Sequence, residues 1–238
     1  LCTRWMELGT FYAFSRNHNA VGAKSQEPYA FGKQLAEISS RVILQRYSLL
    51  QHYYTIFYHI NTEGGAFWRP LFFEFPADPV TYGVEEQFLV GPSLLVSPVL
   101  NSGQTSVNAY FPAGRWYDLN NGDEIKSTGQ HVTLDAPIDH INVHLRGGYT
   151  VARQTPAMTL TDMKFNEFTL FIALNDQKQS VGDLYLDDGE NLNAVSQQLF
   201  THIEYHTDYD QTSDSYTIYP KIIANGYPEI KKYQNTEA

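Results

Sequence analysis

A short polar loop near the beginning of the sequence carries side chains suited to binding a polar ligand. Arg16 and His18 alternate with Asn17 and Asn19 in the stretch SRNHN, shortly after the aromatic run FYAF. The stretch combines a cation, an imidazole and two amides, all of which form hydrogen bonds. Because a helix is expected to follow, the region has β/α character, and loops at the carboxyl ends of barrel strands are where binding sites form. The alternative is a loop whose polar side chains only cap backbone groups.

A second group of candidate residues is acidic. Asp187, Asp188 and Glu190 in the stretch DDGE offer the carboxylates that hydrolysis of a glycosidic bond requires. However, neighbouring side chains on a strand point to opposite faces, and an Asp-Gly pair is a typical turn signal. A turn is therefore the favoured interpretation of this stretch.

Two strand-like segments carry histidines at alternating positions, where a metal site is conceivable. The first set is His140, Asn142 and His144, and the second is His202, Glu204 and His206. Neither set matches the spacing of a known type of zinc site, and both segments alternate as half-exposed strands do. The sequence therefore favours a structural role for both sets and predicts no metal ligand.

The first elements predicted to position these side chains are helices. Residues 2–8 have the pattern of a helix end, and Gly9 opens a polar loop that runs to Gln26. A long helix is expected from Glu27-Pro28, because proline is favoured in the first helical turn, to the turn Glu63-Gly64-Gly65. Its apolar stripe is Leu35, Ile38, Val42, Leu49, Tyr53, Ile56 and Ile60.

The pattern changes from helices to strands along the chain. The run at 71–76, LFFEFP, suits a buried parallel strand, and a short helix is expected near 82–88. After Gly91, short segments rich in β-branched and aromatic residues alternate with turns about every ten residues, as in a β-sandwich. A second series of strands begins at about residue 165. A domain boundary is expected near residue 90.

Composition and charge limit the classes of partner. Of the 238 residues, 42% are hydrophobic, and the formal net charge is −10. The acidic surplus lies after residue 76, and an acidic surface disfavours nucleic acid and anionic membranes. With no apolar run of the length that spans a bilayer, no membrane insertion is expected in this chain. The composition suits a globular protein that binds a neutral ligand.

The single cysteine, Cys2, has two interpretations. A lone cysteine is commonly a buried free thiol, whereas in a secreted protein it indicates a partner outside the sequence shown. The chain opens within an amphipathic pattern and without an initiator methionine, so we expect a piece of a longer polypeptide.

Several segments, taken together, resemble glycoside hydrolase family 31. They are LCTRWMELGTFYAFSRNHN, QEPYAFG, RYSLLQHYYTIFY, WRPLFFEFP, GPSLLVSPVL, FPAGRWYDL, HVTLDAPIDHINVHLRGGY and GDLYLDDGE, and they follow the order of the family. The RNHN form is similar to the acid α-glucosidases of the lysosomal, intestinal, plant and fungal type. The resemblance covers residues 1 to about 195.

The resemblance implies a fold and a division into domains. Residues 1–90 would be the C-terminal part of a (β/α)8 catalytic barrel, residues 91–164 the proximal C-terminal β-sandwich, and residues 165–238 the start of the distal one. The expected fold class is thus an α/β barrel remnant followed by all-β domains.

The resemblance also implies an activity, that of a retaining, exo-acting α-glucosidase. Such an enzyme releases terminal non-reducing glucose from α-linked gluco-oligosaccharides of the maltose type and needs no metal or organic cofactor. The nucleophilic and acid/base aspartates would lie on an N-terminal chain of the same precursor, an obligate partner, so no catalytic residue is assigned in this chain.

The family pattern assigns roles to three residues of this chain. His18 would donate a hydrogen bond to hydroxyls of the terminal glucose, and Arg16 would brace the loop through a carboxylate. Cys2 would form a disulfide with a cysteine about ten residues upstream, which fits a secreted, lysosomal or vacuolar enzyme. The rival hypothesis is a non-catalytic carbohydrate-binding or scaffold protein whose β-sandwiches bind glycan.

Overall fold

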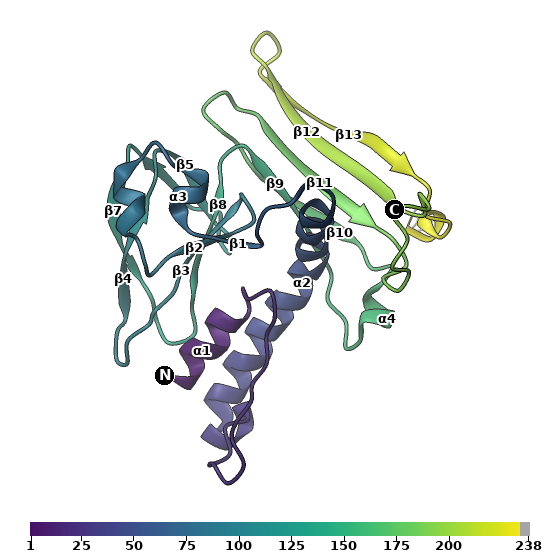
Figure 1. The fold of residues 1–238 in the computed structure, drawn as a ribbon. Helices are drawn as coiled ribbons and strands as arrows, with labels where there is room; N and C mark the ends of the chain where they lie inside the picture. Colours follow the sequence, from purple (N-terminus) through teal and green to yellow (C-terminus); the bar gives the residue numbers. More distant parts are fainter. Residues whose placement is uncertain (234–238) are drawn as a thin grey trace. The chain divides into compact units, whose positions relative to one another are not determined.

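The computed structural model describes residues 1–233, which form two compact units. The first unit comprises Leu1–Arg46 and Ala66–Arg146, and the second comprises Tyr47–Gly65 and, of the described residues, 147–233. The helices come first and the strands later, as the sequence predicts (Figure 1). The domain boundaries expected after residues 90 and 164 stay predictions, and the last domain, 165–238, ends outside the described residues.

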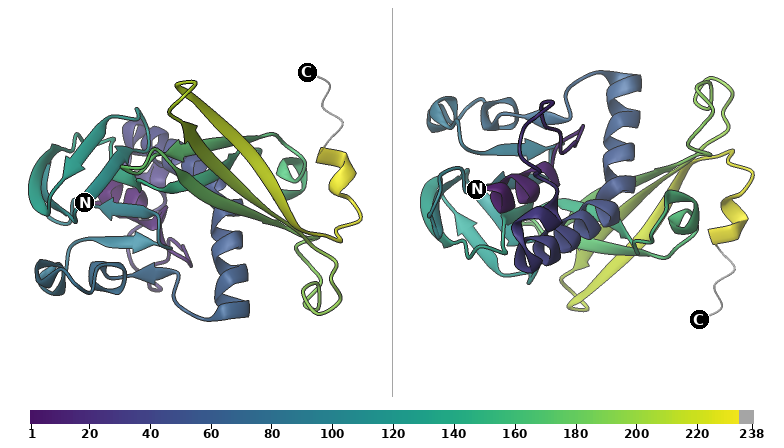
Figure 2. Two further views of the ribbon diagram at one scale, coloured as in Figure 1. Left: turned by 90° about the horizontal axis from the view of Figure 1, so that it is seen from above. Right: turned by 90° about the horizontal axis from the view of Figure 1, so that it is seen from below.

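The first unit begins with helix α1, a long loop and the first half of helix α2, whose second half belongs to the second unit. Helix α1 (Cys2–Gly9) ends where the sequence predicts. A 3-10 turn, η1 (Pro28–Phe31), then precedes helix α2 (Lys33–Glu63). The views in Figures 1 and 2 show the loop running beside the first half of α2.

The expected start of the long helix at Glu27-Pro28 is wrong. Pro28 does open a turn, but Gly32 interrupts the helix with φ 93° and ψ 175°, a conformation that favours glycine. The α-helix therefore begins at Lys33. Its end at Glu63 is as predicted, because Gly64 and Gly65 both adopt positive φ.

The apolar stripe predicted for α2 forms its buried face. Leu35, Ile38, Val42, Leu49, Tyr53 and Ile56 are all buried, and Ile60 near the end is half-buried. The spacing of apolar residues therefore identified this face correctly.

The expected parallel strand at 71–76 is wrong, because these residues form a helical turn, α3 (Leu71–Glu74). The strand is instead β1 (Trp68–Arg69), which pairs antiparallel with β2 (Phe88–Val90). Pro70 follows β1 directly and has no N–H for a ladder, so pairing stops there.

The helix expected near 82–88 is displaced. A 3-10 turn, η2 (Pro79–Gly83), precedes that position, and Asp78 caps it by accepting a hydrogen bond from the backbone of Val80. The chain then extends into β2 instead of continuing as a helix.

Two antiparallel sheets complete the first unit, and they confirm the sandwich predicted after Gly91. A six-stranded sheet has the order β1-β2-β3-β8-β5-β6, and a two-stranded sheet pairs β4 with β7. The remaining bounds are β3 (Leu94–Ser97), β4 (Ser106–Phe111), β5 (Gly114–Asp118), β6 (Glu124–Ser127), β7 (Gln130–Asp135) and β8 (Asn142–Arg146). Leu95 of β3, Phe111 of β4 and Trp116 of β5 belong to one buried cluster, so the core joins both sheets.

The second unit is built on a five-stranded sheet of order β10-β9-β11-β12-β13. Its elements are β9 (Tyr149–Gln154), the helical turn α4 (Leu160–Met163), β10 (Phe168–Ala173), β11 (Ser180–Leu186), β12 (Thr201–Asp210), β13 (Ser215–Asn225) and the 3-10 turn η3 (Ile230–Tyr233). The long strands β12 and β13 form a hairpin at one edge of the sheet (Figure 2). Ala152, Leu184, Leu186 and Tyr227 form the buried core of this unit.

Candidate functional site

The loop between α1 and η1, residues 10–27, is held at its beginning by one arginine of α2. The Arg46 guanidinium donates hydrogen bonds to the carbonyls of Thr10 (2.8 Å), Tyr12 (2.6 Å) and Ala13 (3.2 Å), and lies 3.4 Å from that of Gly9. A guanidinium presents five donors in a rigid fork, so one side chain can fix a whole stretch of backbone. The sequence predicted no role for Arg46, because a polar residue in a helix gives no sign of which loop it binds.

Helix α1 is anchored by a second arginine, which is buried. Arg4 donates to the carbonyls of Ala136, Pro137 (2.8 Å) and His140 (3.0 Å), and to the Glu7 carboxylate (3.1 Å). The residues 136–140 come from the connection between β7 and β8. The end of α1, where the loop starts, is thus fixed to the β-sandwich of the same unit.

The tip of the loop is closed by side-chain amides. The Asn17 amide donates to the Gln26 carbonyl (3.0 Å), and the Gln26 amide donates to Asn17 Oδ1 (2.9 Å) and to the His18 carbonyl. The Asn19 amide donates to the Lys24 carbonyl. The two asparagines therefore cap backbone groups, as the alternative interpretation of this loop proposed.

Arg16 and His18 differ from the asparagines between which they lie. Both side chains are exposed, and neither forms a side-chain hydrogen bond or ion pair with another of the residues 1–233. The carboxylate that Arg16 was expected to bind is thus not found within this described part, and that role stays a prediction. The loop offers a free imidazole and a free guanidinium on a backbone that Arg46 holds at its beginning and that side-chain amides close at its tip.

A cavity of about 270 Å³ opens beside the loop and is lined by the first unit. Arg16, Asn17 and Gln26 provide polar groups to its wall, while Trp5 and Tyr12 provide aromatic ones. His18 is not among the lining residues. Tyr12 is held in turn by Trp68, whose ring meets it edge to face at 4.5 Å.

Cys2 also lines this cavity and is exposed. The interpretation as a buried free thiol is therefore wrong, because α1 presents its first turn on the surface. A disulfide with a cysteine outside this sequence stays a prediction, since Cys2 is the single cysteine here.

Helix α1 carries a buried carboxyl group, that of Glu7, a residue only 1% exposed. Burial raises the pKa of Glu7 to about 7, although the hydrogen bond and the charge of Arg4 lower it. Glu7 Oε1 is buried without a hydrogen-bond partner, which fits the cost of keeping this carboxyl group ionised.

The DDGE stretch forms a turn, as predicted, and its carboxylates are engaged within the second unit. Asp188 accepts hydrogen bonds from the backbone of Glu190 (3.0 Å) and Asn191 (2.8 Å). Asp187 accepts from the backbone of Gly189 (2.8 Å).

Two tyrosine hydroxyls also donate to Asp187, that of Tyr54 at 2.9 Å and that of Tyr185 at 2.7 Å. These bonds hold the beginning of the turn against α2 and β11. Asp187 therefore has a structural role, and its position needs no catalytic explanation.

Of the first histidine set, Asn142 and His144 lie on β8 and have structural roles within the first unit, whereas His140 lies in the connection before the strand. The Asn142 amide donates to the Asp135 carbonyl at 3.0 Å, and the His144 ring packs edge to face on Phe111 at 4.8 Å. Burial lowers the pKa of His144 to about 4, so this imidazole is neutral at physiological pH.

The two histidines of the set on β12, His202 and His206, contact different carboxylates. His206 lies 3.0 Å from Glu204, which also binds Lys221 of β13. His202 instead contacts Asp183 of β11 at 2.7 Å. The pattern of alternation could not reveal this contact, because Asp183 lies on another strand.

No helix in the part of the chain that the structure describes is both long enough and apolar enough to cross a bilayer.

Two family models match consecutive parts of the chain. The model described as the glycosyl hydrolases family 31 TIM-barrel domain matches residues 1–56, which include the loop. The model described as the glycosyl hydrolase family 31 C-terminal domain matches residues 64–151. The expected fold class, a barrel remnant followed by β domains, is thereby confirmed.

Curated relatives are similar over most of this chain. It is 39% identical over 223 residues to the lysosomal alpha-glucosidase of Rattus norvegicus, covering 86% of the chain, and 45% identical over 201 residues to the alpha-glucosidase of Mucor javanicus, covering 82%. The chain spans 23% of the length of each of these relatives.

A solved structure has a similar fold over nearly the whole chain. The GH31 dextranase of Flavobacterium johnsoniae complexed with glucose matches with a TM-score of 0.87 and 29% sequence identity. The match covers 94% of this chain and 28% of the dextranase chain.

Proposed function

The chain belongs to glycosyl hydrolase family 31, and from this premise we propose that it forms the C-terminal part of a retaining, exo-acting α-glucosidase. The enzyme releases glucose from the non-reducing ends of maltose-type oligosaccharides. The relatives named above support the glycosidase class, and the glucose in the dextranase structure supports a glucosyl ligand.

The single observation that carries this proposal is the arrangement of the SRNHN loop. Its asparagines are used in closing the loop, whereas Arg16 and His18 keep their side chains available. Arg46 fixes the backbone that leads into the loop, so the two available groups are presented at a defined place. A binding site works best when its contacting side chains sit on such a fixed backbone.

In the proposed mechanism, the loop forms one wall of the glucose pocket. The His18 imidazole donates a hydrogen bond to hydroxyls of the terminal glucose. A sugar that lacks the matching hydroxyl leaves this group unpaired in a closed site, at a cost of about 1–3 kcal/mol. Arg16 braces the loop through a carboxylate of the preceding part of the protein.

The covalent chemistry is performed by two aspartates of that preceding part, about 5 Å apart in a retaining enzyme. One attacks the anomeric carbon, and the other protonates the leaving oxygen and then activates the water that hydrolyses the glycosyl-enzyme. No residue of this chain takes part in these steps. Asp187, the best carboxylate candidate of the sequence, is already bound by Tyr54 and Tyr185.

The proposal includes the domain boundaries and the compartment. Residues 1–90 complete the barrel, residues 91–164 form the proximal sandwich, and residues 165–238 begin the distal one. Cys2 pairs with an upstream cysteine, as suits an enzyme that is secreted or reaches the lysosome or vacuole through the secretory pathway, because disulfides form in the oxidising lumen of that pathway.

The stereochemistry of the released glucose tests the function. The whole protein is incubated with 4-nitrophenyl α-glucoside, whose leaving group is not a sugar, and the anomers of the first glucose formed are followed by proton NMR. Glucose release from maltose is measured separately. Net retention at an α-linked substrate gives the α-anomer first, before mutarotation. Release of the β-anomer first, or no glucose at all from α-linked oligosaccharides, would contradict the proposal.

A further inference from the structure

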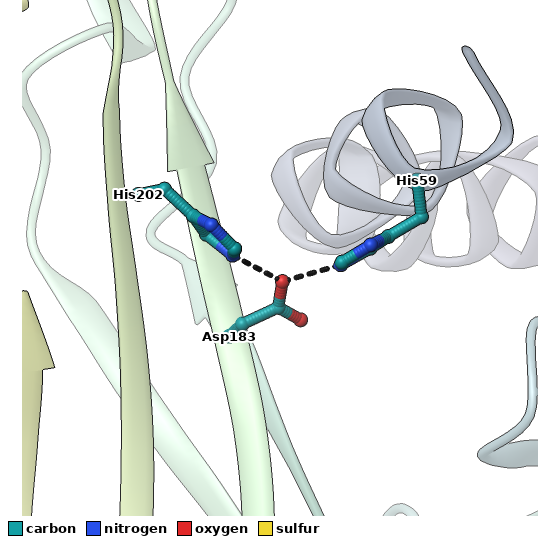
Figure 3. Close-up of side chains that lie close together, drawn as sticks. All are labelled: His59, Asp183 and His202. Atoms are coloured by element: carbon teal, nitrogen blue, oxygen red, sulfur yellow. Dashed lines mark hydrogen bonds and ion pairs between the residues drawn. The ribbon is translucent and has the colours of Figure 1, made fainter. Parts of the chain in front are cut away.

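Three side chains of types that bind metal ions meet within the second unit. Asp183 Oδ2 lies 2.6 Å from His59 Nε2 and 2.7 Å from His202 Nε2 (Figure 3). The three atoms all lie within 4.8 Å of one another. Among residues 1–233 this is the one such group of three or more histidine, cysteine or acidic side chains.

The three side chains come from three elements that are held together independently of them. Asp183 pairs with Glu204 and Tyr185 pairs with His202 across β11 and β12, so Asp183 and His202 are diagonal neighbours on one face of the sheet. Helix α2 delivers His59 to the same face.

The position of the helix is fixed by contacts to Tyr185. Tyr58 stacks on the Tyr185 ring with 4.2 Å between centroids, and the Thr55 hydroxyl accepts a hydrogen bond from the Tyr185 backbone at 3.1 Å. The site is therefore built on rigid elements, as metal sites in proteins require.

Two carboxylate groups lie beside His59. Its Nδ1 lies 3.1 Å from Glu63 Oε1 and its Nε2 lies 2.6 Å from Asp183 Oδ2, so both ring nitrogens face a carboxylate oxygen. Nearby carboxylates favour positive charge, so these surroundings suit a bound cation.

We propose that His59, Asp183 and His202 bind a divalent transition-metal ion of the zinc class. Two imidazole nitrogens and one carboxylate oxygen are a typical zinc donor set, with a fourth position left for water. Ligand atoms about 2.1 Å from a tetrahedral ion lie roughly 3.4 Å apart, so small rotations of these side chains suffice.

The surroundings fit a bound ion in two further ways. The Glu63 carboxylate accepts a hydrogen bond from Nδ1 of His59. A contact of this kind orients the ring so that its other nitrogen, Nε2, faces the metal. The side chains of His59 and Asp183 are 35% and 25% exposed, which leaves a path for the ion, whereas His202 is buried. The ion has a structural role, because it ties α2 to β11 and β12 within the second unit.

Metal binding to the whole enzyme tests this proposal. The protein is stripped with a chelator, dialysed and titrated with ZnCl2 by calorimetry, and separately with CoCl2 by visible absorption. We expect wild type to bind one zinc ion more per chain than His59→Gln does, with a raised Tm, and to show the intense visible bands of tetrahedral Co2+. His59 is partly exposed and glutamine can still bond Asp183, so the variant should fold.

The matched control is His206→Gln. His206 lies on the same strand as His202 and contacts Glu204, not Asp183, so this variant should bind zinc as wild type does. Glu63→Gln should weaken the affinity roughly 10- to 100-fold without removing a ligand. The proposal is overturned if wild type shows no tetrahedral Co2+ spectrum, if His59→Gln binds as much zinc as wild type, or if His206→Gln loses as much as His59→Gln.

Discussion

At the scale of single residues, the buried carboxyl group of Glu7 makes stability depend on pH. Its pKa in the folded protein, about 7, lies above its ordinary value of 4.5 because burial disfavours the charged form. Between these two pH values the folded state binds more protons than the unfolded state. Stability is therefore lost as pH rises through this window, by up to about 3 kcal/mol, and nothing is lost below it.

Replacing Glu7 by glutamine should remove this dependence. Glutamine keeps an acceptor for Arg4 and cannot ionise, so the Tm of Glu7→Gln relative to wild type should rise between about pH 4.5 and about pH 7.5. Thermal unfolding of the whole enzyme across this range measures the difference. A difference that stays constant, or that falls with rising pH, would show that Glu7 is ionised throughout.

Asp187 should matter for stability and little for turnover. Asp187→Ala removes acceptors from the Tyr54 and Tyr185 hydroxyls and from the Gly189 backbone, so we expect a loss of roughly 1–3 kcal/mol. The value of kcat/KM for maltose should stay within a few-fold of wild type at a temperature where the variant is folded. Unfolding curves and initial rates on the same samples separate the two effects.

At the scale of elements, Arg46 of α2 should control the order of the SRNHN loop. Arg46→Lys keeps the charge but loses the fork that bonds several carbonyls. We expect faster amide hydrogen exchange in residues 10–27 and a fall of roughly 10-fold in kcat/KM, because a misplaced loop weakens contacts made in the transition state.

Arg41→Lys is the matched control for this prediction. Arg41 lies on the same helix, is largely exposed and forms an ion pair with Asp139. Replacing its guanidinium by an ammonium group should change neither the hydrogen exchange of the loop nor kcat/KM. If Arg46→Lys leaves hydrogen exchange in the loop unchanged, the loop is positioned by other contacts.

Periodicity predicted the elements well where one face of each is buried. The strands after Gly91 and the buried stripe of α2 were found as expected. The failures have local causes. Gly32 breaks the helix after Pro28, and Pro70 ends β1 just before the apolar run that resembled a strand. Strand β2 was missed because it is only three residues long, and a helix was expected there.

The sequence proposed only exposed residues for the site, and their role in binding stays a prediction. The motif resemblance pointed to Arg16 and His18, and both side chains are available in the structure. The role of Arg46 and the pKa of Glu7 depend on packing between segments that are far apart in the sequence. The same is true of the contact between His59 and Asp183, which are 124 positions apart.

At the scale of the whole molecule, the proposed function has this chain provide one wall of the glucose pocket and no catalytic carboxylate. The polypeptide of 238 residues should therefore release no glucose from maltose when it is expressed alone. It should also be poorly soluble, because Trp5, Phe14 and Tyr29 are 54%, 75% and 74% exposed on the barrel segment.

Co-expression with the N-terminal part of the same protein should restore both properties. Glucose release and size-exclusion chromatography, measured on the chain alone and on the co-purified pair, check this prediction. Maltase activity of the chain alone would place catalytic groups within it. That result would contradict the proposal that the catalytic aspartates lie in the preceding part of the protein.

The most direct test of the central claim is the kinetics of His18→Ala in the whole enzyme. Loss of one or two hydrogen bonds that tighten in the transition state should cost roughly 1.5–3 kcal/mol, or about 10- to 150-fold in kcat/KM for maltose. Folding should change little, because the side chain is exposed and has no bond within residues 1–233. Lys24→Ala, which alters an exposed side chain of the same loop, should keep wild-type kinetics. Full activity in His18→Ala, together with a loss of activity in folded Asp187→Ala or Asp188→Ala, would contradict the assignment and make the DDGE stretch the chemical centre.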